Sequence, residues 1–204
     1  MLFGLTFSMS YFCKMEFLTT DLEAALEILR NGGLILYPTD TVWGIGCDAT
    51  NPEAIARIYQ LKKRSDRKSM IILLADERDL LQYVAAPDME VWNFLDQAQK
   101  PTTVIYENAL SLPENLVNED GSIGIRIVKE TFCKHLIKRL GKPIVSTSAN
   151  ISGEPTAPHF SQISPQIIQG VDYVVKYRQE DTTPTQPSSV VKWNDDGTLT
   201  VLRP

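Results

Sequence analysis

Two polar segments that contain glycine each follow a short apolar run, and this repeated pattern constrains the fold more than any other feature. The polar segment at 37–48 follows the apolar run 34–36, and the one at 146–153 follows 143–145. Apolar runs of this length, bounded by proline, glycine or hydroxyl residues, are typical of buried strands. In open α/β sheets, ligands bind just beyond the carboxyl ends of the strands. The pattern therefore predicts an α/β sheet with a binding site beyond two strand ends.

A basic run lies between the two polar segments. Residues 62–68 include Lys62, Lys63, Arg64, Arg67 and Lys68. Hydroxyl groups and glycines bring the backbone close to phosphate or carboxylate oxygens, and clustered lysine and arginine neutralise their charge. A solvated helix end would explain an isolated run of charges, but this run leads directly into an apolar strand. The combination predicts an anion site of the kind that binds a nucleotide.

The composition is that of one globular domain. The chain has 204 residues, of which 43% are hydrophobic and 22% are charged, and its formal net charge is −5. This length can bury a proper core, and the acidic balance argues against nucleic-acid binding over the whole surface. Three cysteines, at 13, 47 and 133, give no disulfide framework. We expect no protein-bound metal, because no set of well-spaced ligands is present.

We expect residues 1–14 to be an N-terminal extension and residues 15–204 to form a single domain. Residues 1–13 are apolar and lack a basic leader. They are too short to span a membrane and do not resemble a secretory signal. Because no other segment is apolar enough to be a transmembrane helix, the sequence favours a cytoplasmic protein.

Apolar periodicity and capping residues predict strands mixed with helices, in an α/β or α+β sheet with mixed strand directions. Helices are expected at 20–31, 51–61, 77–84, 88–97 and 130–140. Strands are expected at 34–37, 70–74, 102–106, 122–128, 144–145, 171–177, 189–193 and 198–202. The turn at 194–197 is a good hairpin signal between the last two strands. Residues 155–165 are expected to form a connection.

Three motifs in this order resemble the YrdC family. They are the tyrosine-proline-threonine segment at 37–39, the pair Lys62 and Arg64, and the pair Ser148 and Asn150. The similarity runs from about residue 34 to residue 203. Family members are threonylcarbamoyl-adenylate synthases that act in tRNA modification. The resemblance implies a twisted, largely open mixed sheet flanked by helices, with a concave ligand-binding surface.

The resemblance also implies a role for individual residues. Lys62 and Arg64 would contact the phosphates and carry the catalytic charge. The residues expected to bind ATP are Arg64, Lys68, Ser122, Ser148, Asn150, Thr156 and Arg203. The residues expected to bind L-threonine are Thr41, Arg126, Ser146, Ser188 and Ser189. If Lys62 and Arg64 face an open cleft, their loss should hardly affect folding.

Arg126 lies on an expected strand between apolar neighbours. A buried arginine needs an anionic partner, because desolvating it unpaired costs several kcal/mol. That partner is either an internal carboxylate or, as the resemblance implies, the carboxylate of the substrate. Two positions depart from the family pattern: Trp43 replaces a common tyrosine, and Leu73 stands where some members have a histidine.

ATP, L-threonine and bicarbonate are the substrates that the resemblance implies, with magnesium held through the phosphates and a downstream threonylcarbamoyl transferase complex as partner. No protein-ligated metal and no membrane are expected. RNA, tRNA included, stays open as a partner, because an RNA-binding or translation-associated module of the same fold, without strong synthase activity, is the alternative. Carbamoyl transfer to another acceptor would require partner domains that we do not expect. The sequence has no P-loop and no nucleophile elbow, so neither a P-loop ATPase nor a covalent hydrolase is supported.

Overall fold

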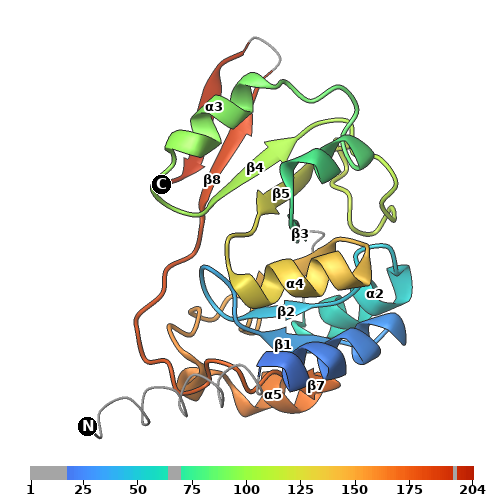
Figure 1. The fold of residues 1–204 in the computed structure, drawn as a ribbon, viewed down its shortest axis with the longest axis vertical. Coiled ribbons are helices and arrows are strands. Elements are labelled where there is room, and N and C mark those ends of the chain that lie inside the picture. Colours follow the sequence, from blue (N-terminus) through green and yellow to red (C-terminus); the bar gives the residue numbers. More distant parts are fainter. Residues whose placement is uncertain (1–17, 64–69, 195–196) are drawn as a thin grey trace, which may run out of the picture.

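The computed structural model describes residues 18–63, 70–194 and 197–204. Within them, nine strands form one sheet in the order β7-β1-β2-β6-β3-β5-β4-β8-β9 (Figure 1). The strands are β1 Ile35–Tyr37, β2 Gly44–Gly46, β3 Ile71–Leu74, β4 Thr102–Tyr106, β5 Ile123–Ile127, β6 Ile144–Ser148, β7 Tyr173–Val174, β8 Ser189–Trp193 and β9 Leu199–Arg203. The helices are one at 18–30, α2 Pro52–Leu61, α3 Glu90–Gln97, α4 Thr131–Leu140 and α5 Pro165–Gly170, with 3-10 turns η1 Glu77–Gln82 and η2 Phe160–Gln162.

Strand directions are mixed, as the sequence predicts. The pairs β1–β7, β3–β5 and β4–β8 are parallel. The remaining neighbours, among them β1–β2, β2–β6 and β3–β6, are antiparallel. The sheet stays open, since β7 and β9 stand at opposite ends of the strand order. The predicted open mixed sheet is therefore confirmed.

Side chains alternate between the two faces of the sheet and feed two hydrophobic cores. On β3, Ile72 and Leu74 belong to the first core, whereas Leu73 belongs to the second. This alternation follows from the two-residue period of a strand. Helices α2 and α3 contribute to the first core, and the helix at 18–30 contributes with α4 to the second. Helices therefore cover both faces of the sheet.

Capping residues fix the start of α2 and thereby the place of Lys62. The Asn51 side chain accepts a hydrogen bond from Ala54 N at 3.0 Å, and Pro52 occupies the first helical position. Both features are typical of helix starts. The helix ends at Leu61, with Lys62 as its C-terminal cap. The first residue of the predicted basic run is thus held at a defined helix end.

Several elements differ from the sequence prediction. The helix expected at 77–84 is the 3-10 turn η1, and only two residues of the strand expected at 171–177 form β7. Strand β2 was not expected, because three residues with two glycines carry no hydrophobic period. Strand β6 continues through the polar residues 146–148, which pair with β2 and β3. Helix α5 lies partly in and beyond the expected connection at 155–165, and Ser164 caps it. It is too short for periodicity to reveal it.

Several expectations lie outside the described residues: the N-terminal extension at 1–14, the turn residues 195–196, and Arg64 and Lys68. Among the helices that are described, none has the length and apolar character needed to cross a bilayer.

Replacing Gly46 by alanine should destabilise the fold. A Cβ there would lie 2.6 Å from the Val145 carbonyl oxygen and 2.7 Å from the Tyr37 ring. Since a backbone atom must then move, we expect a loss of about 1–3 kcal/mol in the free energy of unfolding, measured by denaturant titration. Gly44→Ala is the control, because its methyl would meet the rotatable Ser146 hydroxyl at 3.1 Å. Equal stability of the two variants would contradict this account of β2.

Candidate functional site

A pocket of about 310 Å³ opens on the sheet between the two polar segments. Among the described residues it is lined by Thr41, Val42, Trp43, Gly44, Lys62, Ile71, Arg126, Ser146, Thr147, Ser148, Asn150, Ser152, Gly153, Thr156, Pro187, Ser188 and Arg203. Its volume lies in the range of small-molecule sites, about 300–1,000 Å³. Ser146 and Ser148 lie on the same face of β6 as Ile144 of the second core, because a strand has a two-residue period.

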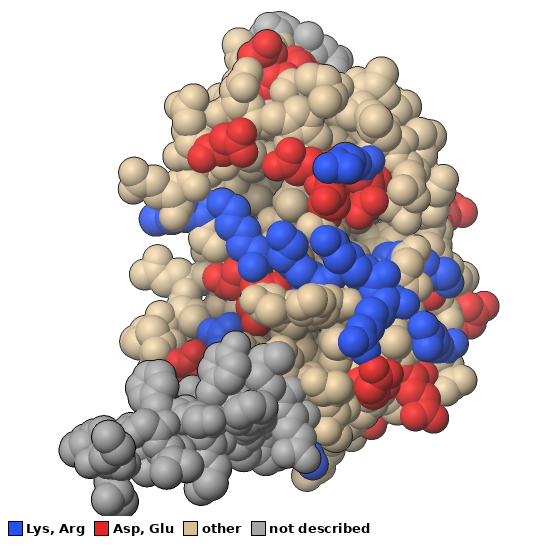
Figure 2. Space-filling view, in the orientation of Figure 1, with Lys and Arg blue, Asp and Glu red and all other residues tan. Residues whose placement is uncertain are grey.

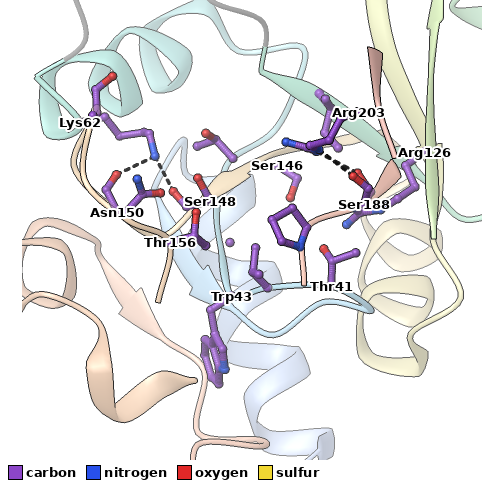
Figure 3. Close-up of a pocket in the computed structure, with 17 residues that line it drawn as sticks. Thr41, Trp43, Lys62, Arg126, Ser146, Ser148, Asn150, Thr156, Ser188 and Arg203 are labelled. Carbon is purple, nitrogen blue, oxygen red and sulfur yellow. Dashed lines mark hydrogen bonds between the residues drawn. The ribbon is translucent and has the colours of Figure 1, made fainter. Parts of the chain in front are cut away.

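Lys62 and Asn150 mark one end of the pocket, together with Ser148 and Thr156 (Figure 3). The Lys62 ammonium donates hydrogen bonds to the backbone oxygens of Ser148 and Asn150, the latter at 2.7 Å. Lys62 is only 2% exposed. The condition that it faces an open cleft is therefore not met, and its charge also holds the loop after β6.

The Asn150 side chain offers an acceptor at the same end. Its Nδ2 donates to the backbone oxygens of Ile151 and Glu154, at 3.0 and 2.7 Å. These two bonds fix the orientation of the amide. Its Oδ1 is buried and has no hydrogen-bond partner in the described part of the chain. Buried polar atoms are usually paired, so this oxygen is suited to a ligand that donates, such as an amine or a hydroxyl.

Arg126 and Arg203 bring positive charge to the other end of the pocket, beside Thr41, Ser146 and Ser188 (Figure 3). Arg203 Nε donates to the Ser188 carbonyl oxygen at 2.8 Å. Burial, and then the neighbouring Arg126 cation, lower the pKa of Arg203. Two guanidinium groups that repel each other in a partly buried wall favour an anionic ligand.

Arg126 has both an internal partner and an unpaired donor. Its Nη2 lies 3.1 Å from Asp40 Oδ1, so the internal carboxylate considered for this arginine is present. Its Nε is buried without a hydrogen-bond partner among the described residues. The side chain is only 4% exposed. Asp40 thus offsets the burial of the charge, and a donor remains on a residue that lines the pocket.

The turn between β1 and β2 is held by its own hydroxyl groups. Thr39 Oγ1 accepts from Thr41 N at 3.0 Å and donates to the Val42 carbonyl oxygen at 2.8 Å. It also lies 3.0 Å from Thr41 Oγ1 and 3.5 Å from Arg126 Nη2. The turn therefore fixes Thr41 in the pocket wall and links it to Arg126.

The pocket brings together most of the described residues that the sequence predicts for the site, but not all. Ser122 and Ser189 are absent from its lining. The Ser122 hydroxyl and the Ser122 N donate to Asp120 Oδ1, at 2.6 and 3.0 Å. These two hydrogen bonds lower the pKa of Asp120. Ser189 N donates to the Pro101 carbonyl oxygen, as the first residue of β8. Leu73, the departure noted above, lies in the second core.

Some lining residues were not singled out from the sequence. Ser152 and Gly153 lie within the predicted polar segment 146–153, but neither was given a role of its own. Ile71 carried no signal, because an apolar strand residue gives no hint that it lines a pocket. Trp43 lines the pocket and packs against Phe160, with ring centroids 4.9 Å apart. Within the described residues, no group of three histidine, cysteine or acidic side chains could hold a metal ion.

The chain is similar in sequence to known proteins. The Sua5/YciO/YrdC family model, described as telomere recombination, matches residues 27–204. A threonylcarbamoyl-AMP synthase of Xanthomonas campestris is 34% identical over 161 residues, which cover 77% of this chain and 86% of the relative. The threonylcarbamoyl-AMP synthase of Vibrio campbellii is 31% identical over 185 residues, which cover 89% of this chain and 97% of the relative.

Solved structures share the fold. The crystal structure of P. abyssi Sua5 in complex with L-threonine matches with a TM-score of 0.79 at 22% identity, and the match covers 90% of this chain and 53% of Sua5. E. coli YciO matches with a TM-score of 0.77 at 25% identity and covers 89% of this chain and 87% of YciO. The extent of the family match and the identity to the bacterial relatives together establish that this chain belongs to the Sua5/YciO/YrdC family.

Proposed function

We propose that this chain is a threonylcarbamoyl-AMP synthase, which forms threonylcarbamoyl-AMP and pyrophosphate from L-threonine, bicarbonate or carbon dioxide, and ATP. The observation that carries the proposal is one pocket with cations and hydroxyl groups at both ends. The bacterial relatives reported above are themselves named threonylcarbamoyl-AMP synthases. A cytoplasmic location and a role in tRNA modification belong to the same proposal.

The chemistry requires alignment more than a protein nucleophile. The amine of threonine adds to carbon dioxide, loses a proton and becomes a carbamate. A carbamate oxygen then bonds to the α-phosphorus of ATP, and the bond from this phosphorus to the β-phosphate oxygen breaks to release pyrophosphate. Both reactants are anions, so they must be held together against their repulsion. Fixed positive charge also stabilises the charge that grows in the transition state.

The two ends of the pocket suit the two substrates. Arg126, with its unpaired Nε, would bind the threonine carboxylate, and Thr41 and Ser146 would face its hydroxyl group. At the other end Asn150 Oδ1 would accept a hydrogen bond from the nucleotide, beside Ser148 and Thr156. Arg203 was expected to contact ATP but lies with Arg126 and Ser188. We therefore place the phosphates between the ends, within reach of Arg203 and Lys62.

Magnesium would enter with the nucleotide. No aspartate or glutamate is among the described residues that line the pocket. Hard cations prefer oxygen ligands, and magnesium is commonly held through substrate phosphates. A magnesium ion would thus be bound by ATP rather than by protein carboxylates, and it would supply further neutralising charge. Arg64 and Lys68, outside the described residues, complete the proposed phosphate contacts.

The RNA-binding alternative has one observation in its favour. Lysine and arginine gather in a band across one face of the molecule (Figure 2), in the region of α4. The last turn of α4 carries Lys138 and Arg139, both exposed. Such a band on an acidic protein suits a polyanion. It does not require the pocket, so RNA binding and synthesis can be tested separately.

One incubation tests the proposal. Protein, ATP, L-threonine and bicarbonate are mixed, pyrophosphate is followed over time, and the adenylate is identified by mass spectrometry. Threonine-dependent release of pyrophosphate supports the synthase. Tight RNA binding without any turnover would favour the alternative.

Arg126→Ala should weaken the binding of threonine while ATP still binds. A charge-assisted hydrogen bond is worth about 1.5–3 kcal/mol, roughly ten- to hundredfold in affinity. We expect the KM for threonine to rise by at least that factor, whereas calorimetry should find ATP affinity within about threefold of wild type. Arg126→Lys keeps the positive charge but lacks the planar guanidinium. Its KM for threonine should therefore lie between those of wild type and Arg126→Ala. An unchanged threonine KM would remove Arg126 from the site.

Lys62→Ala should weaken ATP binding about tenfold and also lower stability. The ammonium serves two backbone oxygens, and leaving buried acceptors unpaired costs about 1–3 kcal/mol. Calorimetric titration with ATP and denaturant unfolding measure the two effects. The neighbouring Lys63 is exposed, so Lys63→Ala is the matched control for removal of one charge. Equal ATP affinity and equal stability of Lys62→Ala and Lys63→Ala would exclude the proposed role of Lys62.

Amino-acid selectivity should follow from the hydroxyl groups at the Arg126 end. A site that hydrogen-bonds a substrate hydroxyl strongly rejects an analogue without it, because its own groups are left unpaired. We expect serine to be a poor substrate, through the missing methyl contact, and valine to be poorer still. Pyrophosphate release with each amino acid measures the order. Valine turnover equal to that of threonine would show that the amino-acid site is misplaced.

A further inference from the structure

The segment at 175–188 joins β7 to β8 and runs along one side of the molecule (Figure 1). Both of its ends touch the pocket region. Near the far end, Ser188 lines the pocket, and its hydroxyl lies 2.9 Å from Thr103 Oγ1. Near the start, Arg178 reaches the turn between β1 and β2. The family motifs in the sequence do not include Arg178.

The guanidinium of Arg178 bridges two groups that are far apart in sequence. Its Nη1 donates to the Thr39 carbonyl oxygen at 3.1 Å. Its Nε and Nη2 donate to Asp181 Oδ2, at 3.2 and 3.1 Å. Asp181 also accepts from Thr183 N at 3.0 Å, and the bonds from Thr183 and Arg178 lower its pKa. A planar fork with donors in fixed directions suits this double contact, and an ammonium group cannot reproduce it.

The backbone at Arg178 confirms that its position is tightly held. Its φ is +66°, a left-handed conformation that is unfavourable for a residue with a Cβ. Such conformations persist where the surrounding structure fixes them, and they cluster at functional sites. The residues before it are also anchored, because Tyr177 N donates to Asp21 Oδ2 at 2.6 Å. The segment therefore presents Arg178 to Thr39 from a fixed base.

Thr39 connects Arg178 to two residues that line the pocket. Its carbonyl oxygen is held by Arg178, while its hydroxyl accepts from Thr41 N and lies beside Arg126 Nη2. Thr41 and Arg126 line the pocket, but Arg178 does not. A shift of the Thr39 backbone would move both groups that we assign to threonine. The Lys62 end does not share these contacts.

We propose that Arg178 is a positioning residue for the amino-acid end of the pocket: it fixes the Thr39–Thr41 turn and thereby the affinity for threonine, not the affinity for ATP. This inference rests on the proposed function for the identity of the ligand. The geometric part, that Arg178 rigidifies the turn, stands apart from it. Both parts can be tested in the same set of variants.

The experiment compares Arg178→Ala and Arg178→Lys with a matched control on the full chain. Arg57 is that control, because its guanidinium also bridges a backbone oxygen, of Gly32, and an aspartate, Asp172. Arg57 does not line the pocket. For each variant we would measure KM for threonine and for ATP, the melting temperature, and hydrogen exchange of the Thr41 amide.

We expect Arg178→Ala to raise the KM for threonine about tenfold or more, to leave the KM for ATP within about twofold, and to speed exchange of the Thr41 amide. Arg178→Lys should show a smaller rise in the KM for threonine and a smaller increase in Thr41 amide exchange than Arg178→Ala. Arg57→Ala should lower the melting temperature comparably and change neither KM. If both Arg178 variants matched Arg57→Ala in threonine KM and in Thr41 exchange, the inference would be overturned.

Failure of the proposed function has a different signature. If the wild-type protein released no threonine-dependent pyrophosphate, the synthase proposal would fail, while faster Thr41 exchange in Arg178→Ala would still support the positioning role. Should Arg178→Ala not fold, Arg178→Lys and the Thr41 exchange rate keep the test decisive.

Discussion

The close approach of β2 to β6 is the constraint on which the site depends. Strand β2 is antiparallel to both β1 and β6, and it lies between them. Its glycines allow this, since a Cβ on Gly46 would collide with the Val145 backbone. The consequence is functional as well as structural. Two polar segments about a hundred residues apart in sequence become adjacent walls of one pocket.

Positive charge predominates in this pocket, because no acidic residue is among the described residues that line it. Arg126 is buried on a strand and has Asp40 beside it, but its Nε stays unpaired among the described residues. Arg203 shares its wall, and burial, followed by the neighbouring Arg126 cation, lowers the pKa of Arg203. A buried cation without full compensation is costly. An incoming anion lowers that cost, so the free protein is prepared for a carboxylate or a phosphate.

Two cationic side chains, Lys62 in the pocket lining and Arg178 outside it, hold the walls of the pocket. Lys62 ties the loop after β6 through backbone oxygens, and the Arg178–Asp181 pair ties the turn after β1. Lys62 acts at one end of the pocket through the loop after β6, and Arg178 acts at the other end through the turn after β1. This separation gives the fold a physical basis for adjusting affinity for the two substrates independently. In a two-substrate reaction between anions, alignment of this kind supplies much of the acceleration.

The sequence by itself determined the strands with strong apolar periods and the helix at 52–61, which ends just before Lys62. It also determined the two polar segments that line the pocket. Local propensity and the family motifs are enough for these, because each depends on neighbours within a few residues. Only the tertiary structure decided that three residues around Ile45 form an inner strand, that Ser122 is not in the pocket lining, and that Lys62 is buried. It also decided that Arg178 holds Thr39 from 139 residues away. Contacts at such separations leave no period or motif in the sequence, because they arise from the packing of the sheet as a whole.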